Sequence, residues 1–324
     1  MSLTNYSFGI SSFGVPVLGG GMPPLTNSVG KFIFVDATYG VDGNDGSSWD
    51  TAVKTIAQAY SMTTTNHDDV ILLSTNAVHT LTAMLDCSKS RVHFVGDPYG
   101  RAYGQRARIY MGVTTASTDV FLMKNTGVGN TFNGIKFWDA NTLATFHLGC
   151  VGEGGEYGTY RNCEFYASVN LDSDTFAEVV LNGDSAQFYN CTFGSLADVV
   201  VGDKIRPAVR MANGVVGTGL VSRDVLFDGC KFWKKAGGTT TSFIKIAASA
   251  DLERGMEIKN CSFIASILGS VPATAITSAT LTNGYVMLSG DTIAYNCTKV
   301  GTATGILNGT PARVATATIG IQAT

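Results

Sequence analysis

The chain of 324 residues carries a net charge of −3, and 45% of its residues are hydrophobic against 15% charged. This composition is too apolar for a disordered protein, and with no basic run beyond Lys234-Lys235 it argues against a nucleic-acid partner. Since no stretch approaches the roughly 18 apolar residues of a transmembrane helix, we expect no membrane partner either.

The first 30 residues are expected to form an extended, glycine-rich attachment arm that precedes the repeats of the chain. This arm lacks the basic start and the long apolar run of a signal peptide. Because an apolar arm needs a surface to lie against, we expect it to dock on a partner in a larger assembly. The alternative is that it folds back along its own body. The residues expected to make the contact are Phe8, Ile10, Phe13, Val15, Val17 and Leu18.

Residues 31–66 are expected to form a first strand, a loop and a helix that cap the body. The apolar run Lys31–Val35 predicts the strand. Apolar residues at helical spacing predict a helix from Trp49 to Met62, with Ser48 or Asp50 as its N-cap. Those apolar residues are Ala52, Val53, Ile56, Ala57 and Tyr60.

The loop between that strand and that helix offers hard oxygen ligands in Asp36, Asp42, Asn44 and Asp45, so calcium is one interpretation. The spacing lacks the glutamate that closes an EF-hand loop. We favour the alternative that these carboxylates form Asx-turns and cap the helix. We therefore expect no metal and no cofactor.

A four-residue motif recurs through residues 121–298 at spacings of 28 to 39 residues. Its first position is Asn or Gly, its second is Cys or Ile, and its fourth is Phe in all but the last copy. Each spacing fits one coil of three short strands with loops, and such coils stack at the strand spacing of about 4.8 Å. The copies are Gly134-Ile-Lys-Phe, Asn162-Cys163-Glu-Phe165, Asn190-Cys191-Thr-Phe193, Gly229-Cys230-Lys-Phe232, Asn260-Cys261-Ser-Phe263 and Asn296-Cys297-Thr.

The residue types of the motif indicate where each position lies. Asn and Gly best tolerate left-handed backbone angles, so the first position predicts a sharp bend where Asn side chains can bond along the stack. Alternation then puts the Cys and the Phe on one face of the strand, which must be the interior. Seven cysteines without a Cys-x-x-Cys pair argue against a disulfide framework and a zinc site. We interpret the five motif cysteines as a column of reduced core thiols.

Further strands are predicted around the motif. Upstream, Val70–Leu73, Arg91–Val95 and Arg108–Met111 indicate one or two additional coils. The β-helix is expected to span residues 67–300, and the segment 301–324 to cap the last coil or to pair with another subunit. A second strand precedes each copy of the motif, and these strands begin at Phe121, Phe146, Val179, Val209, Phe243 and Val286.

Three features carry a resemblance to a known family. The segment Val35–Ala59, with Val41-Asp-Gly-Asn-Asp-Gly-Ser-Ser-Trp at its centre, looks like the N-terminal cap of pectin-lyase-like proteins, and the Asn-Cys-x-Phe coils resemble the same superfamily. The leader Ser7–Gly21 is similar to the glycine-rich starts of β-helix virion proteins of tailed bacteriophages. The resemblance implies an all-β fold, a single-stranded right-handed parallel β-helix with an N-terminal arm and a capping helix.

The same resemblance implies a non-enzymatic structural protein of a phage virion, assembled in the host cytoplasm. Its arm would attach it to a capsid or neck protein, as capsid decoration, cement or a head fibre. Proteins of this kind self-associate, so we expect a homo-oligomer, with a trimer as one arrangement.

The alternative function is that of a tail spike or tail fibre that binds or depolymerises host surface polysaccharide. Such a protein needs a groove with paired carboxylates and exposed aromatic rings. Trp138 and Trp233 directly follow the Phe of their motif copies, so they should point outward, where a sugar could stack. Tyr166 holds the same place in its own copy.

A soluble polysaccharide lyase is a third interpretation, because the lyases of this superfamily use a basic residue beside acidic residues or calcium. Arg206 and Arg210 are the basic candidates, and Asp172 with Asp174 is a candidate pair for hydrolysis. The sequence places no acidic cluster next to the arginines, so we expect them to form surface or inter-subunit ion pairs.

The remaining ionisable residues give weaker signals. Asp68-Asp69 precedes a predicted strand and is expected to be solvated in a turn. His93 and His147 are expected to lie in strands, facing outward or bonded within the wall.

Overall fold

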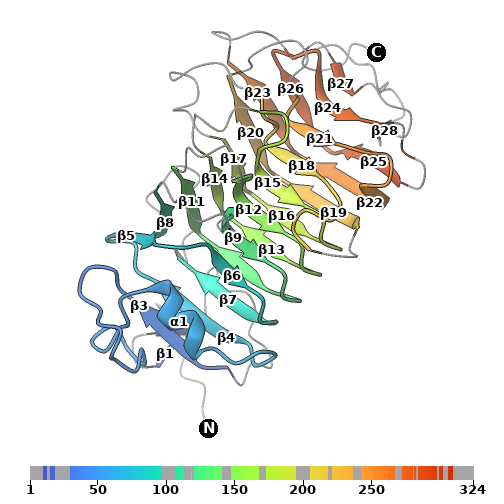
Figure 1. The fold of residues 1–324 in the computed structure, drawn as a ribbon. Coiled ribbons are helices and arrows are strands. Elements are labelled where there is room, and N and C mark those ends of the chain that lie inside the picture. Colours follow the sequence, from blue (N-terminus) through green and yellow to red (C-terminus); the bar gives the residue numbers. More distant parts are fainter. Residues whose placement is uncertain are drawn as a thin grey trace.

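The computed structural model is a right-handed parallel β-helix, which confirms the fold expected from the repeat. Among the described residues, three parallel sheets run along the stack, and successive coils add strands to each of them (Figure 1). The structure describes residues 10–12, 15–18, 30–96, 107–112, 118, 120–140, 147–167, 173–194, 205–217, 221–235, 242–266, 272–279, 281, 284–297, 299–301 and 306–308.

The strands fall into three sheets, which we call the first, second and third. The first sheet contains β3 (Phe32–Val35), β4 (Asp69–Leu73), β7 (Val92–Val95), β10 (Thr131–Asn133), β13 (Thr159–Arg161), β16 (Gln187–Tyr189), β19 (Ser222–Asp228), β22 (Leu252–Lys259), β25 (Gly284–Ser289) and β28 (Ile306–Asn308). The second sheet contains β5 (Val78–Leu81), β8 (Ala107–Met111), β11 (Ile135–Asp139), β14 (Glu164–Tyr166), β17 (Thr192–Phe193), β20 (Lys231–Lys234), β23 (Ser262–Ala265) and β26 (Ile293–Tyr295). The third sheet contains β6 (Leu85–Cys87), β9 (Phe121–Asn125), β12 (Gly149–Glu153), β15 (Ala177–Leu181), β18 (Val209–Met211), β21 (Ile244–Ile246), β24 (Thr274–Ser278) and β27 (Lys299–Gly301).

The stack extends past both of the expected boundaries. The strand β3 pairs in parallel with β4, so the predicted first strand is itself the first rung of the stack. At the other end β28 pairs with β25, so the coils continue beyond residue 300. Nine steps of about 4.8 Å across the ten strands of the first sheet make the stack about 43 Å long. Residues 309–324 lie outside the described residues.

The first motif position forms the bend between the first and second sheets, as predicted. Asn162, Asn190 and Asn260 have φ values of 53°, 52° and 53°, in the left-handed region. The side chains do not form a continuous asparagine column, because glycine holds the position in three coils, at Gly134, Gly229 and Gly290. A Cβ at Gly229 would lie 2.5 Å from Oδ1 of Asn190, so glycine leaves room for that amide. Asn162 instead donates to Oδ1 of Asn133 at 3.3 Å.

Four of the motif cysteines form the predicted column of reduced, buried thiols. Cys163, Cys191, Cys230 and Cys261 are fully buried and free. Each sulfur lies 3.2 to 3.6 Å from two carbonyl oxygens, one in the preceding coil and one two residues earlier in its own coil. Burial, followed by the adjacent thiols of Cys191 and Cys261, raises the pKa of Cys230 well above its usual range.

The last predicted copy of the motif, Asn296-Cys297, is wrong in its register. Ile293 and Ala294 pair with Ser262 and Phe263, so the chain has already entered the second sheet before residue 296. Thr292 takes the place of the cysteine, with its Oγ1 donating to the carbonyls of Ile258 at 3.3 Å and Ser289 at 2.9 Å. Cys297 is still a buried free thiol, but it lies beyond β26.

Because of the register shift in the last coil, the strand predicted to begin at Val286 belongs to a different sheet from the other strands of its series. That strand is β25 in the first sheet, and the strand that precedes it in the third sheet is β24. The predictions at Phe121, Val179 and Val209 fall within β9, β15 and β18 of the third sheet, and Phe243 immediately precedes β21. Phe146 lies outside the described residues.

Two ladders of stacked aromatic rings fill the core. The motif Phe residues of the second sheet stack with centroids 4.7 to 5.3 Å apart, from Phe137 through Phe263. Rings of the first sheet form a parallel ladder at 4.8 to 5.1 Å, and the two ladders meet edge to face. The rings of this second ladder are the side chains two positions before the bend in successive coils. They are Phe94, Phe132, Tyr160, Phe188 and Phe227.

The capping helix is shorter than predicted. The helix α1 spans Ile56–Met62, and its N-cap is Thr55, whose side chain accepts from the Gln58 N–H. Residues before it cannot be helical because Val53 forms a bridge with Val35 and exchanges backbone hydrogen bonds with the β3 edge. The helix does cover the first coil, with Ile56 and Ala59 buried in the core.

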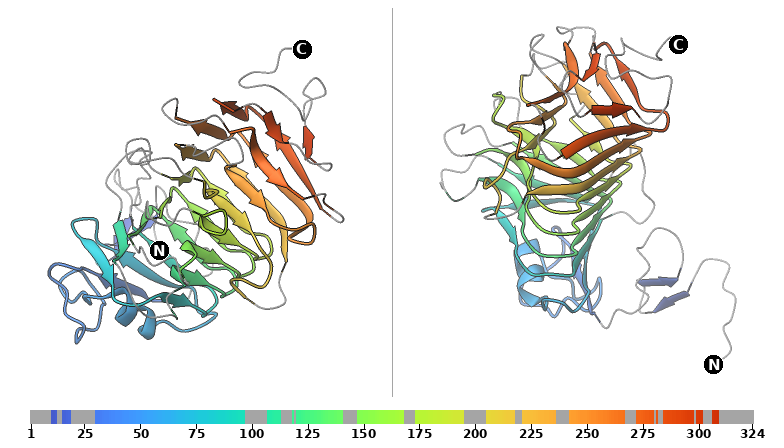
Figure 2. Two further views of the ribbon diagram at one scale, coloured as in Figure 1. Left: turned by 45° about the horizontal axis from the view of Figure 1, so that its top comes forward. Right: turned by 90° about the vertical axis from the view of Figure 1, so that its right-hand side faces the viewer.

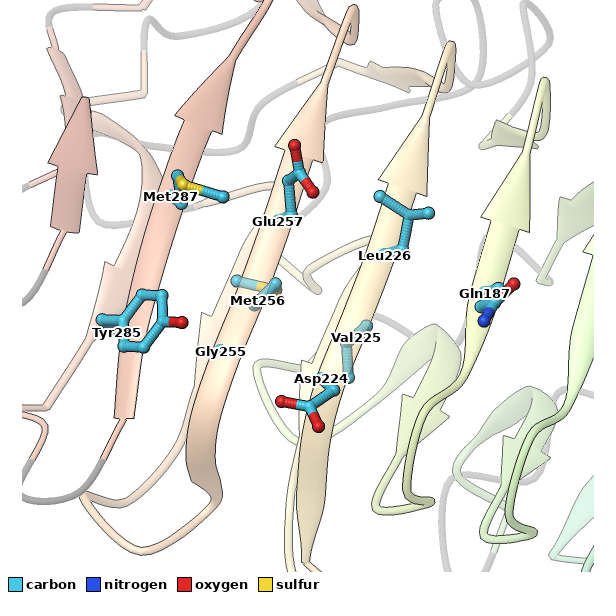
Figure 3. A pocket seen from close by; sticks show the side chains of 9 residues that line it. All are labelled: Gln187, Asp224, Val225, Leu226, Gly255, Met256, Glu257, Tyr285 and Met287. Carbon is cyan, nitrogen blue, oxygen red and sulfur yellow. The ribbon is translucent and has the colours of Figure 1, made fainter. Parts of the chain in front are cut away.

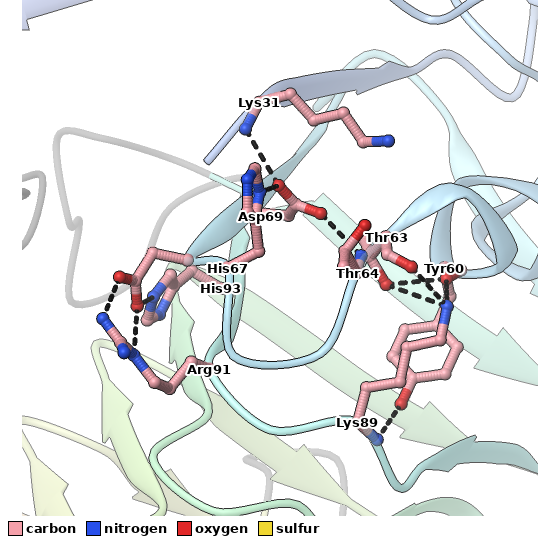
Figure 4. Close-up of polar contacts among 10 residues, drawn as sticks. Lys31, Tyr60, Thr63, Thr64, His67, Asp69, Lys89, Arg91 and His93 are labelled. Atoms are coloured by element: carbon pink, nitrogen blue, oxygen red, sulfur yellow. Dashed lines mark hydrogen bonds and ion pairs between the residues drawn. The ribbon is translucent and has the colours of Figure 1, made fainter. Parts of the chain in front are cut away.

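Polar contacts hold this cap onto the first coils (Figure 4). Nζ of Lys89 donates to the carbonyls of Tyr60 at 2.7 Å, Ser61 at 3.1 Å and Thr63 at 2.7 Å, at the C-terminal end of α1. A cation at this position complements the helix dipole and satisfies carbonyls that lack partners within the helix. The Tyr60 ring stacks 6.2 Å from Phe94 and so continues the aromatic ladder into the cap.

A buried carboxyl lies at the corner between the third and first sheets. Glu153, at the end of β12, accepts from Nδ2 of Asn125 at 2.8 Å, the Gly155 N–H at 2.9 Å and the Tyr160 hydroxyl at 2.5 Å. Burial raises its pKa from the ordinary 4.5 to about 7, although the three hydrogen bonds act in the opposite direction.

This carboxyl makes stability depend on pH. Because the folded chain holds the Glu153 proton more tightly than the unfolded chain, its contribution is complete below pH 4.5 and is lost as the pH rises through about 7. The expected loss in unfolding free energy over this range is about 3 kcal/mol. Denaturant unfolding from pH 4 to 8 should show this slope in the wild type and a flatter one in Glu153→Gln. Equal slopes in the two proteins would contradict the assignment.

Candidate functional site

An outward-facing column of side chains crosses the second sheet, built from the residue that follows the core Phe or its equivalent. The strand register pairs Tyr110 with Trp138 and Trp138 with Tyr166. Further along the stack it pairs Trp233 with Ile264, and Ile264 with Tyr295. We call this set the aromatic column, and its members are Tyr110, Trp138, Tyr166, Trp233, Ile264 and Tyr295.

The aromatic column faces away from the core but is only partly open to solvent. Trp138 and Trp233 are half-buried and alternate along their strands with buried residues, and Tyr295 is 54% exposed. The rings of Tyr110 and Trp138 meet edge to face at 5.0 Å. The indole Nε1 of Trp233 is buried and has no hydrogen-bond partner among the described residues.

Sequence reasoning found the two tryptophans and Tyr166 but missed the ends of the column. Tyr110 belongs to a coil without the Asn-Cys motif, and only the alternation within β8 could have revealed it. Tyr295 was hidden because the misplaced last copy of the motif put it before the bend.

The N-terminal arm contains a hairpin that is separate from the stack. The strands β1 (Ile10–Ser12) and β2 (Val15–Leu18) pair antiparallel with each other and with none of the other described strands. Figure 2 shows this hairpin beside the stack, near its N-terminal end. The arm therefore doubles back over residues expected to be extended. Ile10, Val15, Val17 and Leu18 lie in the hairpin, whereas Phe8 and Phe13 lie outside the described residues.

The acidic loop uses its carboxylates to hold its own backbone. Asp36 accepts from the N–H groups of Thr38 and Tyr39, and Asp45 accepts from that of Ser47. Asp42 accepts from the N–H groups of Lys54 and Thr55 at 2.9 and 2.8 Å. These bonds are the Asx-turns and the helix-start contact of the favoured interpretation. In the described parts of the chain, no three His, Cys, Asp or Glu side chains gather as a metal site.

The basic candidates of the lyase interpretation have structural roles. Arg206 is 1% exposed, and its Nε lies 2.9 Å from Oε1 of Glu178. The prediction of a surface ion pair is therefore wrong for Arg206, because the corner between the second and third sheets buries it. Arg210 faces outward on β18 and donates to the Thr175 carbonyl at 3.1 Å. Asp174 pairs with Lys245 at 2.5 Å, and Asp172 lies outside the described residues.

The adjacent carboxylates Asp68 and Asp69 are not simply solvated. Asp69 is fully buried and accepts from the N–H groups of Lys31 at 2.9 Å and Thr64 at 2.7 Å (Figure 4). Burial would raise the pKa of Asp69, but these bonds and the one from His67 lower it overall. Asp68 bonds Arg91 and His93.

The two wall histidines have carboxylate partners. His93 lies in β7 and is bonded within the wall, as expected. His147 lies ahead of β12 rather than in a strand, buried 2.5 Å from Asp139.

Comparison with known proteins supports the fold. No family model and no curated protein sequence matches the chain. Among solved structures, a pectin methylesterase from Aspergillus niger has a TM-score of 0.54 at 12% identity over 94% of each chain. A rhamnogalacturonan lyase has a TM-score of 0.52 at 14% identity, over 82% of this chain and 68% of its own.

A viral protein is also among the similar structures. The ORF18 protein of Geobacillus virus E2 has a TM-score of 0.49 at 14% identity over 79% of this chain, and the match spans 55% of the viral protein's length. At these identities the methylesterase and the lyase establish the parallel β-helix and no activity. Within the described residues, no helix has the length and hydrophobicity to span a bilayer.

Proposed function

We propose that this chain is a non-enzymatic structural protein of a tailed-phage virion, attached by its N-terminal arm. The observation that carries the proposal is the hairpin β1–β2, which pairs with itself and adds no strand to the three stacked sheets. A segment that does not complete the stack is available to a capsid or neck protein. The glycine-rich leader resembles those of phage virion proteins, which supports the same assignment.

The ionisable residues support a structural role rather than catalysis. The acidic loop, Asp69 and the pair of Arg206 with Glu178 all bond within the wall or the cap. Catalytic carboxylates instead need an oxygen that reaches the substrate. Stacked aromatic ladders and continuous parallel sheets suit a shaft that is exposed outside a cell. We expect copies of the chain to associate on the particle.

Deleting residues 1–29 should abolish binding to purified capsids, because it removes the hairpin and leaves β3 intact. Co-sedimentation of capsids with the full chain and with the truncated chain measures this. The control is the melting temperature, which should stay the same in the two proteins since the stack begins at β3. Undiminished capsid binding by the folded truncated protein would contradict attachment through the arm.

A second candidate function is attachment to host surface polysaccharide, as in a tail spike or tail fibre. The aromatic column favours it, because half-exposed rings at successive coils present a stacking surface along the shaft. Incubation with host capsule, followed by assays for new reducing ends and unsaturated uronates, separates binding from cleavage. New chain ends would establish an enzyme and overturn the non-enzymatic assignment.

A further inference from the structure

A groove lies on the outer face of the first sheet, away from the aromatic column and from the arm. It has a volume of about 310 Å³ and crosses β16, β19, β22 and β25 (Figure 3). That volume is at the lower end of the range for small-molecule sites. The side chains that give it its chemistry are Gln187, Asp224, Glu257, Tyr285 and Met287.

The groove forms where the first sheet widens. The strands β10, β13 and β16 have three residues each, whereas β19, β22 and β25 have seven, eight and six. The register shifts between Arg223 and Val225, and Asp224 and Arg254 have φ values of 46° and 63°. Non-glycine residues in this backbone region mark a bulge that re-aims side chains, and such bulges cluster at functional sites.

One wall of the groove is the aromatic ring of Tyr285, which lies close to the backbone of Gly255 because glycine has no side chain. Tyr285 is 45% exposed, and its ring lies over Gly255. A Cβ at Gly255 would lie 3.1 Å from Cζ and Oη of Tyr285, so glycine permits this close approach. The ring therefore offers an apolar face at the edge of the groove, with Met287 one side-chain position further along β25.

The polar side chains of the groove retain atoms that can form further hydrogen bonds with a ligand. Oε1 of Glu257 accepts from the Ser289 hydroxyl at 2.7 Å, and Oδ2 of Asp224 pairs with Arg254 at 2.7 Å. Each carboxylate thus keeps a second oxygen that can accept. Oε1 of Gln187 accepts from the Tyr189 hydroxyl at 2.8 Å, which leaves its amide nitrogen to donate.

The charge of the lining decides which ligand fits. Two carboxylates line the groove, of which Asp224 is paired with Arg254 whereas Glu257 has no ion-pair partner among the described residues. Hydroxyl and ammonium groups donate to such carboxylates, whereas the carboxylate of a uronate would be repelled. A flat aromatic face beside several hydrogen-bonding groups matches the apolar face and the hydroxyl edge of a pyranose ring.

We propose that this groove binds a neutral or amine-bearing hexose unit of a glycan, stacked on Tyr285 with its hydroxyl or ammonium groups bonded to Glu257 and Asp224. This site does not depend on attachment through the arm. It is also distinct from the aromatic column, which lies on the second sheet. The groove is a binding site, and no bond is broken in it.

Titration calorimetry of the full chain at pH 7 tests the proposal with four probes: the trimers of N-acetylglucosamine, glucosamine and galacturonate, and trilysine. The two hexosamine trimers should bind, and the galacturonate trimer should bind at least about tenfold more weakly. Tyr285→Ala should weaken hexosamine binding about tenfold through the lost stacking surface. Glu257→Gln should weaken the glucosamine trimer more than its neutral N-acetylated counterpart, because it removes a charge and keeps an acceptor.

Matched controls are Tyr295→Ala and Trp138→Ala in the aromatic column, both expected to leave hexosamine binding unchanged, as is deletion of residues 1–29. Unchanged melting temperatures establish that the variants are folded. The proposal is overturned by equal binding of the galacturonate trimer, by binding of trilysine alone, or by no binding of either hexosamine trimer. It is also overturned if Trp138→Ala rather than Tyr285→Ala abolishes binding, which would instead place the glycan on the aromatic column.

Discussion

Replacing Phe165 with alanine is expected to lower the free energy of unfolding by about 3–5 kcal/mol. Its ring is fully buried and stacks 5.3 Å from Phe137 and 5.0 Å from Phe193. It also meets the neighbouring ladder edge to face, at 5.6 Å from Tyr160 and 6.1 Å from Phe188. The backbone hydrogen bonds fix the distance between coils, so these neighbours cannot close the cavity that alanine leaves.

Denaturant unfolding followed by circular dichroism measures the effect of this substitution. Phe165→Leu should cost less because it keeps most of the buried volume. Tyr295→Ala removes an exposed ring and is expected to change stability by no more than about 0.5 kcal/mol. If Phe165→Ala lowered the free energy of unfolding no more than Tyr295→Ala does, the aromatic ladder would not be the main source of the coil's stability.

Arg206→Ala is expected to destabilise the protein by about 3–5 kcal/mol as well, for a different reason. The guanidinium is buried against Glu178, and its NH2 group donates to the Ala167 carbonyl at 3.0 Å. Alanine would leave the Glu178 carboxylate in the wall without this cation and would open a cavity beside it. The cost comes from the buried charge more than from a lost attraction.

A double variant separates these two contributions. Arg206→Met with Glu178→Gln removes both charges and keeps much of the volume, so it should recover a large part of the stability lost in Arg206→Ala. Arg210→Ala, in the third sheet but outward-facing, is the control with a small expected effect. Melting temperatures of the four proteins report the result. A neutral Arg206→Ala variant would contradict the burial of this pair.

The fold was predictable because the decisive positions are local. An Asn or Gly with left-handed backbone angles, then Cys and Phe two residues apart, determines the bend and the inward face of a strand without reference to the rest of the chain. The outward tryptophans follow from the same alternation. The last coil was misread because Thr292 replaces the cysteine while an unrelated Asn-Cys pair follows it.

The start of the helix and the chemistry of the wall depend on contacts between distant residues. Asp42 accepts from Thr55, thirteen positions away, and Val53 is held against β3, so helical spacing from Trp49 was misleading. Arg206 precedes β18, and its partner Glu178 lies in β15, 28 residues earlier in the chain. The groove arises from strand length and a bulge at Asp224, which the pattern of apolar residues does not encode.

Because each copy of the motif builds one coil, the number of copies sets the length of the β-helix in discrete steps. The Asn162 N–H bonds to the Tyr189 carbonyl one coil later, and Asn190 repeats the same conformation, so residues 162–189 form one interchangeable module. Duplicating or losing such a module would change the length by about 4.8 Å and leave the joints at both ends intact. Natural variants could therefore differ in the number of coils, and so in the length of the β-helix, while both ends of the stack stay the same.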